Sequence, residues 1–197
     1  MRIAITGSMG SGKSTVSQLL REMGYHVKDA DQIAKEHLES DCVKIALIKR
    51  YGQRILTCDD TIDKAYLASR IFNYPAEKRQ LEDLIYPFVY AELTARSNDK
   101  IEFSEVPLLF ESSGEQYFDE VWVVVSDEEK MFERLKKNRN YSNEMIQERL
   151  QHQMSQHDKA LLADVIIENN SDTDNLKKQI ENQLERILKQ YELKNTG

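Results

Sequence analysis

Residues 7–15 carry the strongest chemical signature in the chain. They read Gly-Ser-Met-Gly-Ser-Gly-Lys-Ser-Thr and fit the pattern G-x-x-x-x-G-K-[ST] at every defined position. Glycines let consecutive backbone N–H groups curl around a phosphate, and the N-terminus of a following helix attracts the same negative charge. The segment therefore predicts a nucleoside triphosphate site. The residues expected to contact the phosphates are Gly10, Ser11, Gly12, Lys13, Ser14 and Thr15.

Two side chains of this segment have predicted roles of their own. Lys13 would reach the β- and γ-phosphates as a catalytic cation, and Ser14 would hold Mg²⁺ through its hydroxyl. An ordinary glycine-rich turn is the alternative, but the chain has only seven glycines, and Gly7, Gly10 and Gly12 lie within six positions. The loop thus predicts nucleotide binding without identifying the phosphate acceptor.

Carboxylates follow two of the expected strands. Asp29 and Asp31 come directly after a short segment where a second strand is expected, and Glu105 ends a later one. Asp29 with Gln32 fits a capping box, so a helix N-cap is one interpretation of this pair. For Asp31 we favour a catalytic role, because a kinase needs a carboxylate that orients the acceptor hydroxyl and takes its proton. Glu105 is either an acidic partner of Mg²⁺ or a surface carboxylate at a strand end.

Cations are dense between residues 133 and 156. A charged amphipathic helix usually means a solvated face, but two basic helices joined at residues 140–142 also suit a mobile lid over phosphates. Both interpretations stay open at this point. The cations concerned are Arg134, Lys136, Lys137, Arg139 and Arg149.

Short apolar runs alternate with helical patterns along the chain. This alternation, with a glycine loop after the first run, predicts a three-layer α/β fold around a parallel sheet. Helix is expected over 32–49, with an interruption near residues 40–41, and through most of 51–97. Pro87 lies inside the latter pattern and should kink or divide the helix. The expected strands are 3–6, 25–28, 101–106, 121–125 and 165–167.

Composition narrows the class of protein. The chain has 197 residues, 27 Lys+Arg and 34 Asp+Glu, for a net charge of −7, so broad attraction to nucleic acid or acidic lipid is not expected. Cys42 and Cys58 form no CxxC, and the four histidines lack ligand spacing, which argues against a zinc module or a disulfide scaffold. We expect no signal peptide and no membrane span. A cytoplasmic protein, by default a monomer, is the expectation.

The chain resembles the dephospho-coenzyme A kinase family over nearly its whole length. Among the matching segments, VPLLFE and the D-A-D motif are far more specific than the phosphate loop, which very many ATPases share. The segments are ITGSMGSGKST at 5–15, D-A-D at 29–31, YGQRIL at 51–56, ID-x-x-x-L at 62–67, IF at 71–72, VPLLFES at 106–112, RL at 134–135, ERLQHQM at 148–154 and K-x-x-x-AD-x-x-I-x-N at 159–169.

The resemblance implies a reaction and an architecture. The reaction is transfer of the γ-phosphoryl group of ATP, with Mg²⁺, to the ribose 3′-hydroxyl of dephospho-coenzyme A, the last step of coenzyme A synthesis. The architecture is a P-loop kinase fold with a five-stranded parallel sheet. Its implied parts are a core at 1–30, 99–126 and 160–197, a helical acceptor-binding region at 31–98 and a lid at 133–156.

Site residues follow from the resemblance position by position. Asp31 matches the proposed base, and residues 107–111 match the acceptor-side turn. Asn169 or Asn170, with Asn170 preferred, would lie near the adenine of ATP. The residues implied to bind the acceptor are Asp31, Lys64, Tyr86, Pro107, Leu108 and Glu111.

Three positions depart from the family pattern. Tyr86 precedes Pro87 where His-Pro is usual, and Lys64 stands where arginine is usual. Asn138 occupies the usual lid arginine position, with Arg139 beside it. Because lysine lacks the bidentate fork of arginine, these changes bear on acceptor binding and on the lid. Arg139 is the expected catalytic lid residue, and Arg134 and Arg149 are the alternatives.

Two other functions remain open from the residues. One is a small P-loop kinase that phosphorylates a nucleoside monophosphate or another small alcohol. The other is a nucleotide-binding adaptor that has lost phosphoryl transfer. The D-A-D and VPLLFE matches disfavour the first, and the presence of both Asp31 and Ser14 disfavours the second.

Overall fold

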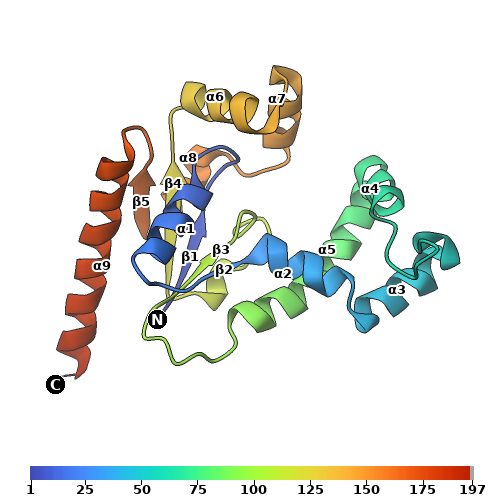
Figure 1. Ribbon diagram of the computed structural model, residues 1–197, viewed down its shortest axis with the longest axis horizontal. Coiled ribbons are helices and arrows are strands. Elements are labelled where there is room, and N and C mark those ends of the chain that lie inside the picture. Colours follow the sequence, from blue (N-terminus) through green and yellow to red (C-terminus); the bar gives the residue numbers. More distant parts are fainter. Residues whose placement is uncertain (196–197) are drawn as a thin grey trace. The chain divides into compact units, whose positions relative to one another are not determined.

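The computed structural model describes the backbone of residues 1–195 and the side chains of these residues except 72, 75 and 191–195. The chain forms two compact units (Figure 1). The core unit comprises Met1–Lys28 and Asn98–Gly197, and the helical unit comprises Asp29–Ser97. They are described separately below.

A five-stranded sheet forms the centre of the core unit. Its strand order is β2-β3-β1-β4-β5, and β1 pairs in parallel with both β3 and β4, as β4 does with β5. The prediction of a five-stranded parallel sheet is therefore confirmed. The strands are β1 (Arg2–Thr6), β2 (Val27–Asp29), β3 (Glu102–Glu105), β4 (Glu120–Val125) and β5 (Val165–Glu168).

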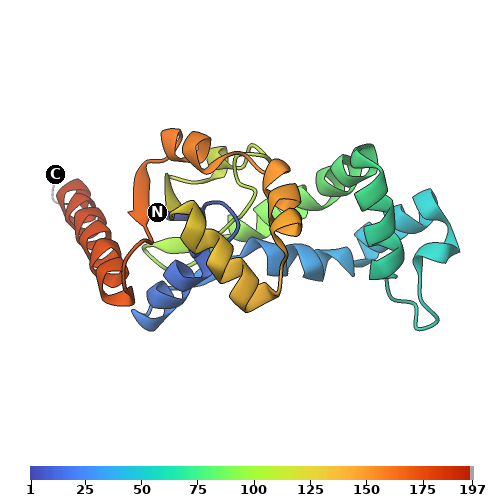
Figure 2. The ribbon, with the colours of Figure 1, turned by 90° about the horizontal axis from the view of Figure 1, so that it is seen from above.

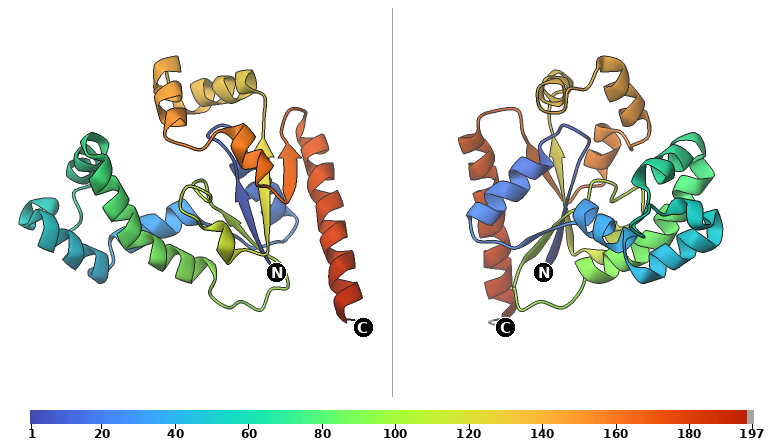
Figure 3. Two further views of the ribbon diagram at one scale, coloured as in Figure 1. Left: turned by 180° about the vertical axis from the view of Figure 1, so that it is seen from behind. Right: turned by 45° about the vertical axis from the view of Figure 1, so that its right-hand side comes forward.

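Helices cover both faces of this sheet. Figure 3 shows α1 (Lys13–Glu22) and α9 (Thr173–Asn195) on one face and α8 (Gln156–Leu161) on the other. The first face is apolar, since Trp122 of β4 is fully buried in one cluster with α1 and α9. Burial of such a face is the main favourable term in forming a three-layer core.

Two further helices of the core unit lie at the carboxyl ends of the strands. These are α6 (Glu128–Arg139) and α7 (Asn143–Gln151), and Figure 2 shows α6 crossing above the loop that follows β1. Asp127 precedes α6, and Glu128 and Glu129 lie in its first turn, where the helix dipole favours acidic side chains. A short 3₁₀ helix, Glu115–Tyr117, precedes β4.

The helical unit contains four α-helices. They are α2 (Ala30–Leu38), α3 (Asp41–Tyr51), α4 (Lys64–Asn73) and α5 (Pro75–Leu93), with a short 3₁₀ helix at Gln53–Ile55. The break between α2 and α3 confirms the interruption predicted near residues 40–41. An ion pair between Arg70 of α4 and Glu77 of α5 joins the last two helices, and it lowers the pKa of the Glu77 carboxyl.

Pro87 lies inside a helix that it does not divide. It was expected to kink or divide the helix, and α5 continues through it as one helix of 19 residues, so the predicted division was wrong and the kink stays a prediction. A proline inside a helix removes one backbone hydrogen bond and crowds the preceding turn. Here Ile85 and Val89 on either side are buried, and α5 packs along α2. Tertiary burial of the helix therefore outweighs the local cost of the proline.

Candidate active site

The loop between β1 and α1 has a backbone that only glycine can adopt at its critical positions. Gly10 and Gly12 have φ angles of 84° and 100°, in the left-handed region. A Cβ on Gly12 would lie 1.9 Å from Asn169 Nδ2, and one on Gly7 would lie 2.4 Å from the Val124 carbonyl oxygen. The motif glycines are therefore required both by conformation and by close packing against the ends of β4 and β5.

Two carbonyl groups of the loop, those of Gly10 and Ser11, accept hydrogen bonds from the surrounding protein. The Ser11 carbonyl oxygen accepts hydrogen bonds from Asn169 Nδ2 at 2.8 Å and from Arg134 Nη1 at 3.3 Å. The C=O and N–H of a trans peptide point in opposite directions, so the Gly12 N–H points into the loop. Ser11 Oγ is buried without a hydrogen-bond partner among the described residues. The inward Gly12 N–H suits a bound phosphate.

Lys13 spans the loop from the first turn of α1. Its side chain is buried, and Nζ donates to the Gly7 carbonyl at 2.9 Å and to the Ser8 carbonyl at 3.1 Å. The ammonium is therefore held at the mouth of the loop rather than in solvent. Ser14 and Thr15, the next two residues of α1, are exposed.

Glu105 and Ser14 are the two residues predicted to hold a metal ion. Glu105 Oε2 accepts a 2.7 Å hydrogen bond from Ser17 Oγ, and Ser17 lies three residues after Ser14 on α1. Residues three apart share a helix face, so a hydroxyl and a carboxylate lie along one side of α1. Hard oxygen donors of this kind fit Mg²⁺, which commonly keeps waters and takes its remaining ligands from substrate phosphates. In the described part of the chain there is no group of three or more His, Cys, Asp or Glu arranged to hold a metal.

Arg134 of α6 donates hydrogen bonds to carbonyl groups of the loop. Its Nη1 lies 3.4 Å from the Gly10 carbonyl oxygen and 3.0 Å from Ser126 Oγ, and its Nη2 donates to the Asn169 carbonyl at 2.8 Å. One guanidinium thus connects the phosphate loop with the residues that follow β4 and β5. Arg134 was one of the alternatives for the lid contact; this geometry gives it hydrogen bonds to loop carbonyls, and its lid role stays a prediction.

The two asparagines after β5 have different surroundings. Asn169 is buried, and its side-chain amide donates a hydrogen bond to the Ser11 carbonyl of the loop. Asn170 Oδ1 instead accepts from Ser126 Oγ at 3.1 Å and from the Asp127 N–H at 2.7 Å. Its expected place near adenine stays a prediction.

The remaining cations of the predicted lid are exposed. Arg139 is the last residue of α6, and Asn140 after it adopts the left-handed conformation with a φ of 56°. Arg149 lies over the Tyr141 ring, with its Cζ 4.7 Å from the ring centroid. Ser142 caps α7 by accepting a hydrogen bond from the Met145 N–H. The predicted cations of the segment therefore divide into Arg134 at the loop and the exposed Lys136, Lys137, Arg139 and Arg149.

Lys159 of α8 is a site residue that sequence reasoning did not single out. It is fully buried, and its Nζ lies 2.9 Å from Glu111 Oε1 and 3.2 Å from Glu111 Oε2. It also donates to the Pro107 carbonyl at 2.9 Å. Burial lowers the pKa of the Lys159 ammonium, and the Glu111 carboxylate opposes that effect. Its place in the 159–169 matching segment was the only sequence signal.

A short linker after α7 contacts both the loop after β1 and the turn at residues 106–112. Gln153 Oε1 accepts from the Met9 N–H of the loop at 3.2 Å, and the Met154 N–H donates to Glu111 Oε1 at 2.8 Å. Gln156 bonds to the backbone N–H and C=O of Ser126, both at 2.9 Å. Residues 153–156, which comprise the end of the linker and the first residue of α8, thus form hydrogen bonds with Met9, Glu111 and Ser126, in three separate segments of the core unit.

The D-A-D motif lies where α2 of the helical unit begins. Asp29 caps this helix by accepting a 3.0 Å hydrogen bond from the Gln32 N–H, which confirms the N-cap interpretation. The side-chain amide of Gln32 donates a 2.8 Å hydrogen bond to Glu36 Oε1. Asp31 is exposed in the first turn of α2.

The two acceptor residues that depart from the family pattern also lie in the helical unit. Lys64 begins α4, and its Nζ lies 3.5 Å from Glu39 Oε1. Tyr86 is half-buried on α5 and meets Tyr90 edge to face, with 6.2 Å between ring centroids. Both positions contain side chains of different shape from the usual ones, and their role in acceptor binding stays a prediction.

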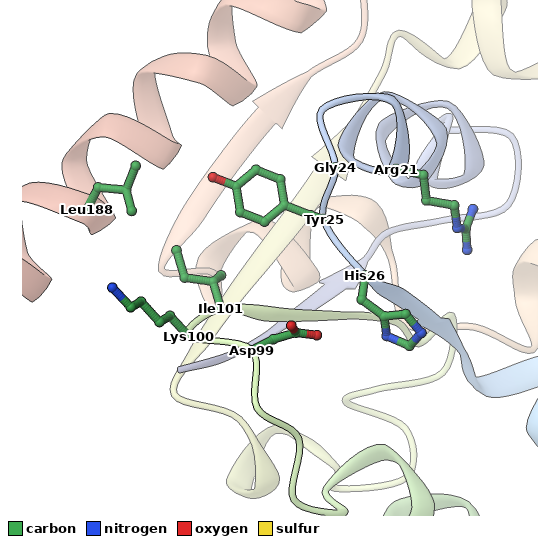
Figure 4. A pocket seen from close by; sticks show the side chains of 8 residues that line it. All are labelled: Arg21, Gly24, Tyr25, His26, Asp99, Lys100, Ile101 and Leu188. Carbon is green, nitrogen blue, oxygen red and sulfur yellow. The ribbon is translucent and has the colours of Figure 1, made fainter.

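A cavity of about 550 Å³ lies at the opposite end of the sheet (Figure 4). Its lining includes Tyr25 and His26, just before β2, and Ile101, just before β3. Ligands of open α/β sheets bind at the carboxyl ends of the strands, where the phosphate loop lies. This cavity is therefore not part of the candidate active site.

Among the helices that the structure describes, none combines the length and the apolar character needed to cross a membrane.

The chain is similar in sequence to dephospho-CoA kinases. Residues 1–175 match the family model described as dephospho-CoA kinase. A dephospho-CoA kinase of Fusobacterium nucleatum is 37% identical over 190 residues, covering 95% of this chain and 98% of the relative. One from Streptococcus agalactiae is 38% identical over 192 residues, covering 94% and 98%.

Solved structures share the fold. The Thermus thermophilus protein TT1252 superposes with a TM-score of 0.82 at 30% identity, covering 94% of this chain and 97% of that one. A dephospho-CoA kinase from Campylobacter jejuni superposes with a TM-score of 0.72 at 24% identity, covering 96% and 98%. The latter similarity supports the fold alone.

Proposed function

Because the chain belongs to the dephospho-CoA kinase family, it is a kinase that catalyses the last step of coenzyme A synthesis, and we propose how its residues divide that reaction. The γ-phosphoryl group of ATP is transferred to dephospho-coenzyme A, which gives coenzyme A and ADP. The observation that carries the proposed roles is the glycine cradle after β1 with the buried Lys13 ammonium held across it.

The loop and α1 bind the phosphates of ATP. Backbone N–H groups from Gly10 to Thr15 contact the phosphate oxygens, and Lys13 offsets the charge that these oxygens carry in the transition state. Ser14, with Glu105 nearby through Ser17, would hold Mg²⁺. When bound, that ion supplies charge neutralisation between the β- and γ-phosphates. Asn170 contacts the adenine.

The acceptor side supplies the base. Asp31 accepts the proton of the ribose 3′-hydroxyl as its oxygen bonds to the γ-phosphorus, while the bond from that phosphorus to the bridging oxygen of ADP breaks. Support for Asp31 comes from the D-A-D match and from its exposed place at the start of α2, where Asp29 already makes the cap. The acceptor contacts we propose are Pro107, Leu108, Glu111, Lys64 and Tyr86.

An acceptor-selectivity assay tests this function. We expect the purified protein with ATP and Mg²⁺ to convert dephospho-coenzyme A to coenzyme A with one ADP formed per product. We expect kcat/KM for dephospho-coenzyme A to be at least ~10²-fold above that for AMP. A site built to bind a particular group of the acceptor strongly disfavours an acceptor that lacks this group. The assay measures both products by chromatography, with an acceptor-free reaction as the control.

Each alternative function predicts a different result in this assay. Equal efficiency with AMP would indicate a nucleoside monophosphate kinase. Phosphorylation of none of the acceptors, together with tight ATP binding, would indicate a nucleotide-binding adaptor.

A second prediction concerns the lid arginines. Arg139→Ala is expected to lower kcat by ~10²-fold or more with little change in the KM for ATP, because an arginine that contacts the phosphoryl group only in the transition state affects turnover alone. Arg149→Ala is expected to be nearly silent, because its side chain already lies over Tyr141. Steady-state kinetics of both variants with dephospho-coenzyme A measure these effects.

Arg134→Ala serves as the comparison for these two variants. This substitution removes hydrogen bonds to Gly10, Ser126 and Asn169, so it should weaken ATP binding and lower thermal stability. A silent Arg139→Ala beside a large kcat loss in Arg149→Ala would move the lid contact to Arg149. Silence of all three would leave 133–156 as a solvated charged face.

A further inference from the structure

Lys159 is an unusual component of the core unit because its ammonium has no access to solvent. The side chain is 0% exposed, and its polar partners all belong to the turn at residues 106–112. These partners are both oxygens of Glu111 and the carbonyl oxygen of Pro107. A lysine on a six-residue helix at the surface of a sheet would ordinarily extend its ammonium into water.

Stability alone does not account for such a pair. Removing an ammonium and a carboxylate from water carries a desolvation penalty, which their mutual attraction offsets only in good geometry. Well-packed apolar residues of similar volume are often as stabilising or more so. A buried pair is therefore better explained by what it holds in place than by net stability.

The hydrogen bonds of Lys159 and Glu111 show which segments this ion pair joins. Glu111 also accepts from the Met154 N–H, so the turn and the linker after α7 meet at one carboxylate. The neighbouring Gln153 accepts from the Met9 N–H of the phosphate loop. On the other side, Thr6 Oγ1, immediately before that loop, donates to the Pro107 carbonyl at 3.3 Å. A continuous set of contacts thus links the turn, the linker and the loop.

We propose that Lys159 is a positioning residue for phosphoryl transfer, which holds the turn at 106–112 and the linker at 153–156 in fixed relation to the phosphate loop. It acts through Glu111 and Pro107 and does not contact a substrate. This inference rests on the proposed function, in which the turn contacts the acceptor. Glu111 then has two roles: it fixes the shape of the turn, and with Pro107 and Leu108 it contacts the acceptor.

Lys159→Met tests the proposal, because methionine keeps an unbranched apolar stem and removes the charge. We expect kcat for transfer to dephospho-coenzyme A to fall by ~10 to 100-fold, since a displacement of about 1 Å in a positioned group has effects of this size. ATP affinity and acceptor-free ATP hydrolysis should change less than about twofold. Both activities scale with the amount of folded protein, so destabilisation by itself leaves their ratio unchanged.

Two further variants separate position from stability. Lys159→Met combined with Glu111→Gln removes the carboxylate left unpaired in the single variant, so thermal stability should recover. Because Glu111 is also a proposed acceptor contact, transfer by this variant is measured as kcat at saturating dephospho-coenzyme A, and it should stay low. Arg186→Met is the matched control. It breaks the ion pair with Glu120 at the start of β4, the end of the strand remote from the phosphate loop. It should lower the melting temperature without changing the ratio of transfer to hydrolysis.

Three outcomes would overturn the inference: normal transfer by Lys159→Met, equal loss of transfer and hydrolysis, or recovery of transfer in the double variant. If the single variant does not fold, the double variant tests the inference: low transfer supports it, and normal transfer contradicts it. Failure of the proposed function is distinguishable, because the unmodified protein would then leave dephospho-coenzyme A unphosphorylated.

Discussion

Replacement of Lys13 by methionine is expected to abolish phosphoryl transfer while the protein stays folded. The ammonium is held at the loop by the Gly7 and Ser8 carbonyls, and it offsets negative charge that builds on the phosphate oxygens in the transition state. Methionine keeps the buried aliphatic stem, so packing should be nearly preserved. We expect kcat/KM to fall by ~10³-fold or more, on the scale of a charged contact made to the transferring group.

Steady-state kinetics with dephospho-coenzyme A measure this loss, and circular dichroism measures folding. Lys177→Met is the matched control, since this lysine lies on α9 and its nearest acidic partner is Glu181 at 3.9 Å. The control should retain full turnover. Near-normal turnover in the Lys13 variant would contradict the assignment of the loop as the phosphate site.

Asp31→Asn is expected to lower kcat by ~10²-fold or more and to leave ATP binding nearly unchanged. The substitution keeps the size of the side chain but removes the carboxylate that takes the acceptor proton. Interpretation is simplified because Asp29, and not Asp31, makes the side-chain cap of α2. Initial rates at saturating acceptor, together with ATP titration calorimetry, distinguish turnover from binding.

Asp29→Asn is the matched control for this substitution. Asparagine caps helices about as well as aspartate, so this variant should retain both stability and kcat. If Asp31→Asn raised only the KM for the acceptor, Asp31 would be a binding residue and the base would have to be sought elsewhere. If both variants lost kcat equally, the effect would belong to the start of α2 as a whole.

Local patterns were sufficient to predict much of the architecture. The glycine spacing identified the phosphate loop because left-handed backbone and close packing at Gly10 and Gly12 admit no side chain. The apolar run at 121–125 identified a central strand, since a strand buried on both faces needs no polar alternation. The capping role of Asp29 was also readable, because its hydrogen-bond partner is only three residues away.

At Pro87 tertiary packing opposed a local preference, and the predicted division of the helix was wrong. Pro87 is unfavourable within a helix on local grounds, but the neighbouring Ile85 and Val89 are buried and α5 packs along α2. The free energy of that burial is contributed by residues distant in sequence. The local pattern of prolines and helix-forming residues therefore gives no measure of that free energy.

The supporting residues of the site were decided by the tertiary structure alone. A lysine on an amphipathic segment predicts an exposed ammonium, yet Lys159 is buried against Pro107, 52 residues earlier. Arg134 meets the Ser11 carbonyl across 123 residues, and spacing along the chain gives no sign of that contact. Sequence by itself therefore determined the residues whose chemistry depends on neighbours in the chain. Only the folded sheet, which places the ends of separate strands at one edge, determined which distant side chains hold them in position.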